Sequence, residues 1–576
     1  MFYLHHVFRS LQPVHNPIGF GAVDFIEFFA AAALVLLALA WPRWSHLAIH
    51  LASRTALCMT ILFVLPIVLR LALLPVHPIP EPAVADDFSY LLLADTLGHF
   101  RLANPPHPMH AFFETLFVLQ EPAYSSIYPL GQGIALALGR VIFGHPWAGV
   151  ALSIGAFCAL CYWMLRAWTT PAWALAGGLL AVIEFGPLSQ WMNSYWGGAV
   201  SAIAGCLVFG ALPRLRERLR MRDAILLGCG LGLQLITRPF ESIFLVVCAV
   251  LFLLPDLRRT IRLAPVIVAA TLPAIALTLV QNRRVTGDWT TLPYSLSRDQ
   301  YGVPSTFTTQ PNPVPHRELT REQRLDYEIQ ASVHGAGTDT MRTYLNRLWT
   351  RVRFYRFFFL APLYLALIAF VPALRAPRMM WLLIPLALFG LGTNFYAYFY
   401  SHYIAAMACV FVLIAVAGLQ RLPPVAAQWI FFACIAYFGL WYAAHLTGDP
   451  AMWQYETWDA INYGDPDGRI AVNRELAALP GKQLVFVRYG AQHTFKEWVY
   501  NAADIDRARV VWAHDLGPSE NEKLLRYYPD RKAWLLEPDA KPVRLKPYVL
   551  PPPPPEPSPK PAPNPKYPHL KFEAVH

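Results

Sequence analysis

Residues 403–418 carry the sequence YIAAMACVFVLIAVAG, which contains no charged side chain. Similar apolar runs recur from Phe25 to Tyr442, and each is near the roughly 20 residues that an α-helix needs to cross a bilayer. Only 15% of the 576 residues are charged, whereas a soluble chain carries about a quarter. The sequence therefore predicts an all-α polytopic membrane protein.

The apolar runs predict about 12 transmembrane helices. Arginines gather in alternate loops, such as 214–222 and 258–262, and the positive-inside rule places those loops in the cytoplasm. These arginines explain the net charge of +10, so no nucleic-acid partner is implied. We expect an integral protein of the bacterial inner (plasma) membrane. The predicted spans are 25–42, 55–75, 148–165, 172–190, 196–212, 224–238, 243–255, 263–281, 355–372, 379–394, 403–418 and 425–442.

Two long outer loops, 76–147 and 282–353, interrupt the predicted membrane domain at 1–445. Within the first loop, 127–144 is apolar enough for a thirteenth span. Counting it would place the later arginine loops outside, so we expect a helix that lies in the membrane interface. The predicted spans are then even in number, and both chain ends face outward.

Beyond residue 445 the composition becomes that of a soluble protein. Strands are expected at 483–488, 509–513 and 532–537, with helical stretches such as 519–527 between them. This pattern predicts a small extracytoplasmic α/β domain over 446–548. The proline-rich remainder, 549–576, is expected to be a disordered tail.

Asp86 and Asp87 form an acidic pair early in the first outer loop. Two adjacent carboxylates repel each other, which raises the pKa of one or recruits a cation. One can then act as a general base, while the other holds a divalent metal ion, Mg or Mn, or orients the acceptor. The alternative is that both occupy the first turn of a helix over 88–97, where acids favour the helix dipole. Residue type alone favours this alternative.

The surrounding sequence favours a functional pair. Residues 86–90 read DDFSY, residues 124–131 read YSSIYPLG, and Thr237-Arg238 ends a middle span on the outer side. This arrangement resembles the GT-C superfamily of membrane glycosyltransferases. It looks closest to the branch of protein O-mannosyltransferases and lipid A aminoarabinose transferases, over roughly residues 50–440.

The resemblance implies a polyprenyl-phosphate sugar donor, and a glycan, lipid or protein acceptor of the cell envelope. Asp86 or Asp87 would be the catalytic base in a single displacement that inverts the anomeric carbon. Arg238 would bind the donor phosphate, since a planar guanidinium meets phosphate oxygens in pairs. The alternative for Arg238 is snorkelling to the membrane interface.

One departure from the superfamily pattern puts the metal ion in doubt. Many relatives carry a second acid in the next outer loop, but residues 189–196 read SQWMNSYW here. Asn193 is the expected neutral substitute. The predicted substrate-binding residues are Tyr90, Glu121, Tyr128, Asn193, His402 and Tyr403.

Arg283 and Arg284 lie just outside a predicted span. Either they bind an anionic lipid phosphate, here that of the donor, or they belong to a long loop that the positive-inside rule tolerates. For His402 and Tyr403, the alternative to substrate contact is an interfacial belt of polar aromatic residues.

Two rival functions remain at this stage. A transporter or lipid flippase typically shows inverted repeats and polar groups at the bilayer midplane. The sequence has no convincing repeat, and its best polar cluster lies outside the predicted bilayer. A third possibility is an assembly module joined to an inactive membrane part, for which Asp86 and Asp87 would be dispensable.

Overall fold

The computed structural model of the chain describes residues 32–37, 39–40, 48–82, 84–335, 337, 339–447, 468–491, 493 and 497–550. Most of the predicted first span, 25–42, lies outside these residues. Residues 448–467 of the predicted C-terminal domain and residues 551–576 of the predicted tail also lie outside them.

Long apolar helices dominate the described residues. Seven helical segments there are long and apolar enough to cross a membrane, and the predicted polytopic all-α architecture is confirmed. One segment of 48 residues, Pro239–Thr286, covers two predicted spans. The count is below about 12 partly because some predicted spans form shorter helices. The seven are Thr55–Ala72, Pro146–Leu165, Ala199–Arg218, Pro239–Thr286, Pro377–Phe395, Ser401–Leu419 and Pro424–Leu446.

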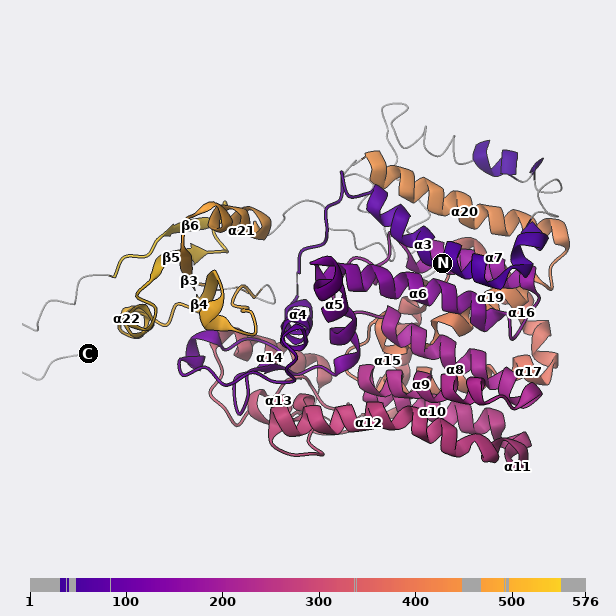
Figure 1. The fold of residues 1–576 in the computed structure, drawn as a ribbon, viewed down its shortest axis with the longest axis horizontal. Helices are drawn as coiled ribbons and strands as arrows, with labels where there is room; N and C mark the ends of the chain where they lie inside the picture. The colour runs from indigo at the N-terminus through magenta and orange to yellow at the C-terminus, as the bar shows by residue number, and fades with distance from the viewer. Residues whose placement is uncertain are drawn as a thin grey trace, which may run out of the picture.

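The helices pack into one bundle (Figure 1). Helix α9 lies against both α8 and α12. A Cβ atom at Gly228 of α9 would lie 2.4 Å from the Ile267 carbonyl oxygen of α12, so glycine permits this approach. The helices of the bundle are α3 (Thr55–Ala72), α6 (Pro146–Leu165), α7 (Pro171–Phe185), α8 (Ala199–Arg218), α9 (Met221–Thr237), α10 (Pro239–Leu253), α11 (Leu257–Thr260), α12 (Ala264–Thr286), α16 (Tyr364–Phe370), α17 (Pro377–Met380), α18 (Leu383–Gly392), α19 (Ala408–Leu419) and α20 (Pro424–Thr447).

The two long loops fold at one end of the bundle. The first holds α4 (Ala85–Gly98), β1 (Val118–Leu119), β2 (Ser125–Ser126) and α5 (Leu130–Phe143). Helix α5 confirms the helix predicted at 127–144, and its 14 residues reach only about 21 Å, short of a bilayer core. The second loop holds α13 (Pro293–Tyr301), α14 (Arg321–His334) and α15 (Met341–Val352).

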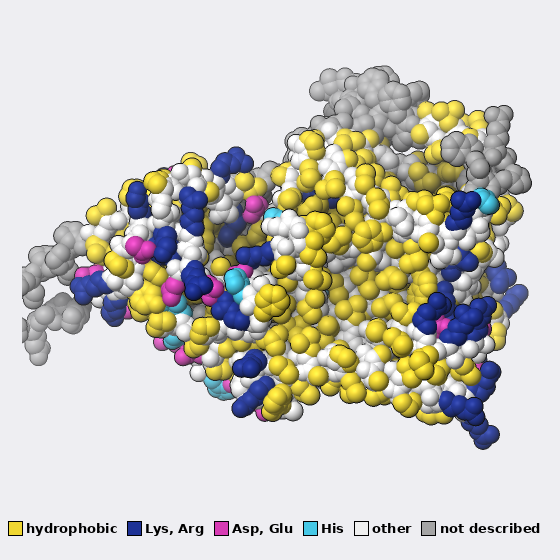
Figure 2. All heavy atoms as spheres, viewed as in Figure 1, with side chains coloured by type: hydrophobic (Ala, Val, Ile, Leu, Met, Phe, Trp, Pro, Cys, Tyr) yellow, Lys and Arg dark blue, Asp and Glu magenta, His cyan; other side chains and the backbone are white. Residues whose placement is uncertain are grey.

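Figure 2 shows apolar side chains over the visible face of the bundle. Basic side chains gather at the end that carries α11, far from the C-terminal strands (Figures 1 and 2). This distribution agrees with a bundle whose arginine-rich end faces the cytoplasm, although the orientation stays a prediction.

The C-terminal residues form a four-stranded sheet in the order β4-β3-β5-β6. Its parallel strands β3 (Lys482–Val487), β4 (Val510–His514) and β5 (Arg531–Glu537) match the predicted ones to within one residue at each end. Helix α22 (Pro518–Tyr527) matches the helix predicted at 519–527, and α21 (Arg469–Ala478) precedes β3. The antiparallel edge strand β6 (Arg544–Pro547) was not predicted, because four residues ending in proline give no alternating pattern.

The C-terminal sheet packs against the first outer loop and its helix α4. One buried cluster joins Leu92 and Phe112 of that loop with Leu484 and Phe486 of β3. This contact ties the position of α4 to the C-terminal unit.

Candidate functional site

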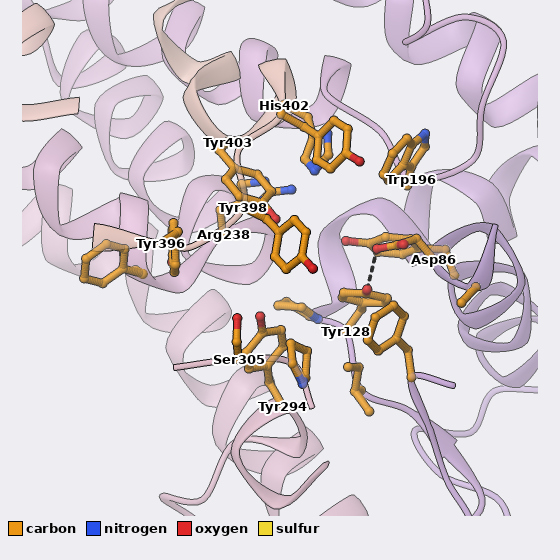
Figure 3. A pocket seen from close by; sticks show the side chains of 18 of the residues that line it. Asp86, Tyr128, Trp196, Arg238, Tyr294, Ser305, Tyr396, Tyr398, His402 and Tyr403 are labelled. Carbon is orange, nitrogen blue, oxygen red and sulfur yellow. Dashed lines mark hydrogen bonds between the residues drawn. The ribbon is translucent and has the colours of Figure 1, made fainter. Parts of the chain in front are cut away.

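A cavity of about 600 Å³ lies where the two long loops meet the bundle. Its walls come from α4, the segment 127–129 before α5, the junction of α9 and α10, α12, α13, α14 and residues 396–403. Figure 3 shows Asp86 and Tyr128 on one side of the cavity and Arg238, His402 and Tyr403 on the other. The predicted site residues that line it are Asp86, Tyr90, Tyr128, Arg238, His402 and Tyr403.

Asp86 lies in the first turn of α4 and points into the cavity (Figure 3). Its Oδ1 accepts a hydrogen bond from the Tyr128 hydroxyl at 2.5 Å. The Tyr128 ring stacks on Tyr90 at 4.3 Å between centroids. Burial raises the pKa of Asp86, while the Tyr128 hydrogen bond and the Arg238 charge oppose the rise. A cavity carboxyl with a raised pKa is suited to accept a proton from a substrate.

Asp87 is adjacent in sequence but does not line the cavity. Its Oδ1 accepts the backbone N–H of Tyr195 at 2.7 Å, and its Oδ2 lies 3.5 Å from the backbone nitrogen of Val84. The side chain is buried. Asp87 therefore ties the start of α4 to the loop before α8, whereas Asp86 faces the cavity, so the two side chains of the acidic pair lie in different surroundings.

Arg238 is the residue between α9 and α10. Its Nη1 lies 3.4 Å from a carboxylate oxygen of the buried Glu241, and its guanidinium lies 4.7 Å from the centroid of the Tyr403 ring. The side chain is only 18% exposed, so it lies in the cavity wall rather than snorkelling outward. The carboxylate and the aromatic ring together hold the guanidinium in place in the cavity wall.

A close contact brings Arg238 near the Tyr128–Asp86 pair. Gly131, in the first turn of α5, packs against the end of α9. A Cβ atom there would lie 2.1 Å from Thr237 Oγ1 and 3.0 Å from Thr237 Cα. Glycine at this position therefore permits the close approach of α5 to the end of α9, where Arg238 follows.

Several residues of the cavity wall were not predicted from the sequence. Four tyrosines from α13 and the segment before η9 (Ser401–Met407) line the cavity. The sequence NFYAYFYSHY at 394–403 is the pattern that points to them, since tyrosine combines an aromatic face with a polar hydroxyl. Their positions are seen in Figure 3, except for the unlabelled Tyr400. The four are Tyr294, Tyr396, Tyr398 and Tyr400.

Two further missed residues, Asp326 and Gln330, come from α14. The Gln330 amide donates to Asp326 Oδ2 at 2.7 Å. Burial raises the pKa of Asp326 to about 7, the Gln330 hydrogen bond opposes this, and the charge of Asp86 adds to it. The polar sequence of α14 gave no indication that one of its acids is buried.

The remaining predicted residues lie outside the cavity wall. The Asn193 amide oxygen accepts from Arg70 Nε at 2.9 Å, and its nitrogen donates to two backbone carbonyls. Glu121 is 49% exposed and pairs with Arg317 at 3.1 Å. Arg283 and Arg284 are exposed at the end of α12. The structure therefore does not bring Asn193, Glu121, Arg283 or Arg284 into the cavity that contains Asp86.

The described residues do not fit the metal site that the superfamily resemblance implies. They contain no group of three or more His, Cys, Asp or Glu side chains that could hold a metal ion. Asp86 faces Tyr128, Asp87 faces Tyr195, and the Asn193 oxygen is engaged by Arg70. The three expected ligands therefore do not converge on one point.

No protein-family model matches the chain, and no curated protein matches it by sequence. Among solved structures, apo ArnT from Cupriavidus metallidurans is 13% identical with a TM-score of 0.47, over 82% of this chain and 92% of that chain.

Two further structures are similar. ArnT from Cupriavidus metallidurans bound to undecaprenyl phosphate is 13% identical, with a TM-score of 0.46. The match covers 83% of this chain and 92% of that chain. The Archaeoglobus fulgidus oligosaccharyltransferase, complexed with Zn and sulfate, is 12% identical, with a TM-score of 0.44. The match covers 83% of this chain and 67% of that chain.

Proposed function

We propose that the chain is a glycosyltransferase that moves a sugar from a polyprenyl-phosphate donor to a cell-envelope acceptor. The observation that carries the proposal is that one cavity contains both a carboxyl suited to proton transfer, Asp86, and a cation suited to phosphate, Arg238. We place this cavity at the outer face of a bacterial inner membrane, with the C-terminal unit on the same side.

Asp86 is the proposed general base. Its carboxylate takes the proton of the acceptor hydroxyl as that oxygen forms a bond to the anomeric carbon of the donor. The bond between the anomeric carbon and the phosphate oxygen breaks, and its electron pair leaves with the lipid phosphate. This single displacement inverts the anomeric centre. Tyr128 holds Asp86 in place, and its hydrogen bond favours the ionised form.

Arg238 is the proposed anchor for the donor phosphate. The guanidinium keeps its place through Glu241 and the Tyr403 ring. During the displacement, negative charge grows on the leaving phosphate, and a fixed cation in a site with little water stabilises that charge strongly. His402 lines the same part of the cavity, as predicted for a substrate-contacting residue.

The experiment uses membranes that contain the full chain, and a radiolabelled polyprenyl-phosphate sugar. Label passed to lipid, glycan or protein is counted for the wild type, Asp86→Asn and Arg238→Ala. The proposal expects transfer by the wild type only. Equal transfer by all three would contradict it. Lipid movement without any transfer would instead support a transporter or flippase.

A further inference from the structure

Helix α14 brings a second carboxyl into the cavity, and the displacement just described does not use it. Asp326 and Gln330 lie four residues apart, on one face of α14, and both line the cavity. Asp326 is 4% exposed and Gln330 is 7% exposed. The neighbouring Glu328 on the same helix is exposed.

Hydrogen bonds fix the orientation of this pair. The Ser305 backbone N–H donates to Gln330 Oε1 at 3.0 Å, so the Gln330 nitrogen faces Asp326 Oδ2 at 2.7 Å. Among the described residues, no hydrogen bond to Asp326 Oδ1 is found. One acceptor atom of a rigid carboxyl–amide pair is thus left for a ligand.

This arrangement lowers the stability of the folded protein, and a role in ligand binding would explain why it is kept. A buried carboxylate normally has a cationic partner, yet Asp326 is held by a neutral amide and lies near a second acid, Asp86. Burial raises its pKa to about 7. A buried acid that forms no ion pair with any described Lys, Arg or His, and that lies in a ligand-sized cavity, is typical of a functional position.

The surrounding wall suits a sugar ring. Tyr294, Tyr398 and Tyr400 line the same cavity, and an aromatic face packs against the C–H face of a sugar. The hydroxyl groups around a sugar ring need acceptors and donors in fixed places, and a carboxyl beside an amide supplies both. Arg238 and Asp86 are already assigned to the phosphate and the acceptor.

We propose that Asp326 and Gln330 form the subsite that binds the hydroxyl groups of the donor's sugar ring. Asp326 Oδ1 accepts a hydrogen bond from one hydroxyl group of the sugar. The Gln330–Asp326 pair binds the hydroxyl group next to it on the ring. This inference rests on the proposed glycosyltransferase function and names the part of the donor that α14 recognises.

The test compares two probes on the purified full chain: undecaprenyl phosphate, and undecaprenyl phosphate that carries glucose. Asp326→Ala is expected to weaken binding of the glucose-bearing probe at least 10-fold and to change binding of the bare lipid phosphate less than 2-fold. Glu328→Ala, an exposed acid on the same helix, is the matched control and should change neither. Arg238→Ala should weaken both probes.

Three outcomes would overturn the inference. If Asp326→Ala and the more conservative Asp326→Asn leave glucose-probe binding unchanged, Asp326 does not contact the sugar. If they weaken both probes equally, their effect is on the phosphate or on the fold. If the wild type binds neither probe, or Arg238→Ala binds both as the wild type does, the proposed function itself fails.

Discussion

Replacing each member of the acidic pair separately gives the sharpest test of the site. Asp86→Asn keeps the size of the side chain and leaves an oxygen that still accepts from Tyr128, but it removes the proton acceptor. Loss of a general base typically costs 10²–10⁴-fold in rate, or about 3–5 kcal/mol of activation free energy. The folded protein should be as stable as the wild type, because burial disfavours the Asp86 charge.

Asp87→Asn should act mainly on stability. The Asp87 carboxylate contacts the backbone nitrogens of Tyr195 and Val84, at 2.7 and 3.5 Å. An asparagine side chain has one oxygen that can accept one of these two backbone N–H groups, and its NH₂ group would face the other N–H group. Leaving a buried donor unsatisfied costs about 1–3 kcal/mol. Any loss of transfer then follows from displacement of α4 and should accompany a lower midpoint of thermal unfolding.

Transfer of labelled sugar in membranes and thermal unfolding of the purified protein are measured for both variants. The expected result is an inactive but stable Asp86→Asn, and a less stable Asp87→Asn with residual activity. The reasoning is refuted if Asp86→Asn transfers sugar near the wild-type rate. It is also refuted if Asp87→Asn is fully stable yet inactive, since Asp87 would then be the reacting carboxylate.

Three further predictions concern packing, pH and orientation. Gly131→Ala should lower transfer at least 10-fold, because its Cβ would meet Thr237 and displace Arg238, whereas Gly439→Ala, with open space around its Cβ, should not. The pKa of Asp326 rises from 3.8 to about 7 on folding, so the folded state keeps a proton that the unfolded state releases. The unfolding free energy of the wild type should therefore fall by up to about 4 kcal/mol from pH 4 to pH 7. Chemical denaturation at several pH values measures this fall, which should be smaller for Asp326→Asn. A thiol introduced by Gly490→Cys should be labelled from outside intact cells, and cytoplasmic protection would contradict the proposed topology.

The fold was largely predictable from sequence because its information is local. Apolar runs such as 403–418 identify spans without knowledge of their neighbours. The strands at 483–488 and 509–513 are short apolar runs with the features of buried parallel strands. Arg544–Pro547 has no such pattern, and only its partner β5 makes it a strand.

The candidate site was predictable only where a motif marked it. Asp86, Tyr128 and Arg238 lie in short motifs, and the structure brings them to one cavity. Nothing in the sequence distinguishes Asp86 from Asp87, because the choice depends on which way each side chain leaves the first turn of α4. Asp326 was missed because its burial comes from long-range packing, while α14 alone resembles a solvent-exposed helix.

Helix α4 links the chemistry to the rest of the chain. At its start, Asp87 accepts from Tyr195 of a loop between bundle helices. Near its end, Asp95 Oδ2 accepts the Ala503 backbone N–H of the C-terminal unit at 2.7 Å. Phe88, two residues after Asp86, stacks on Tyr500 of the same unit at 4.3 Å between centroids. Helix α4, which carries Asp86, is therefore held by two units at once, and the C-terminal unit contributes to the candidate site through this helix rather than by lining the cavity.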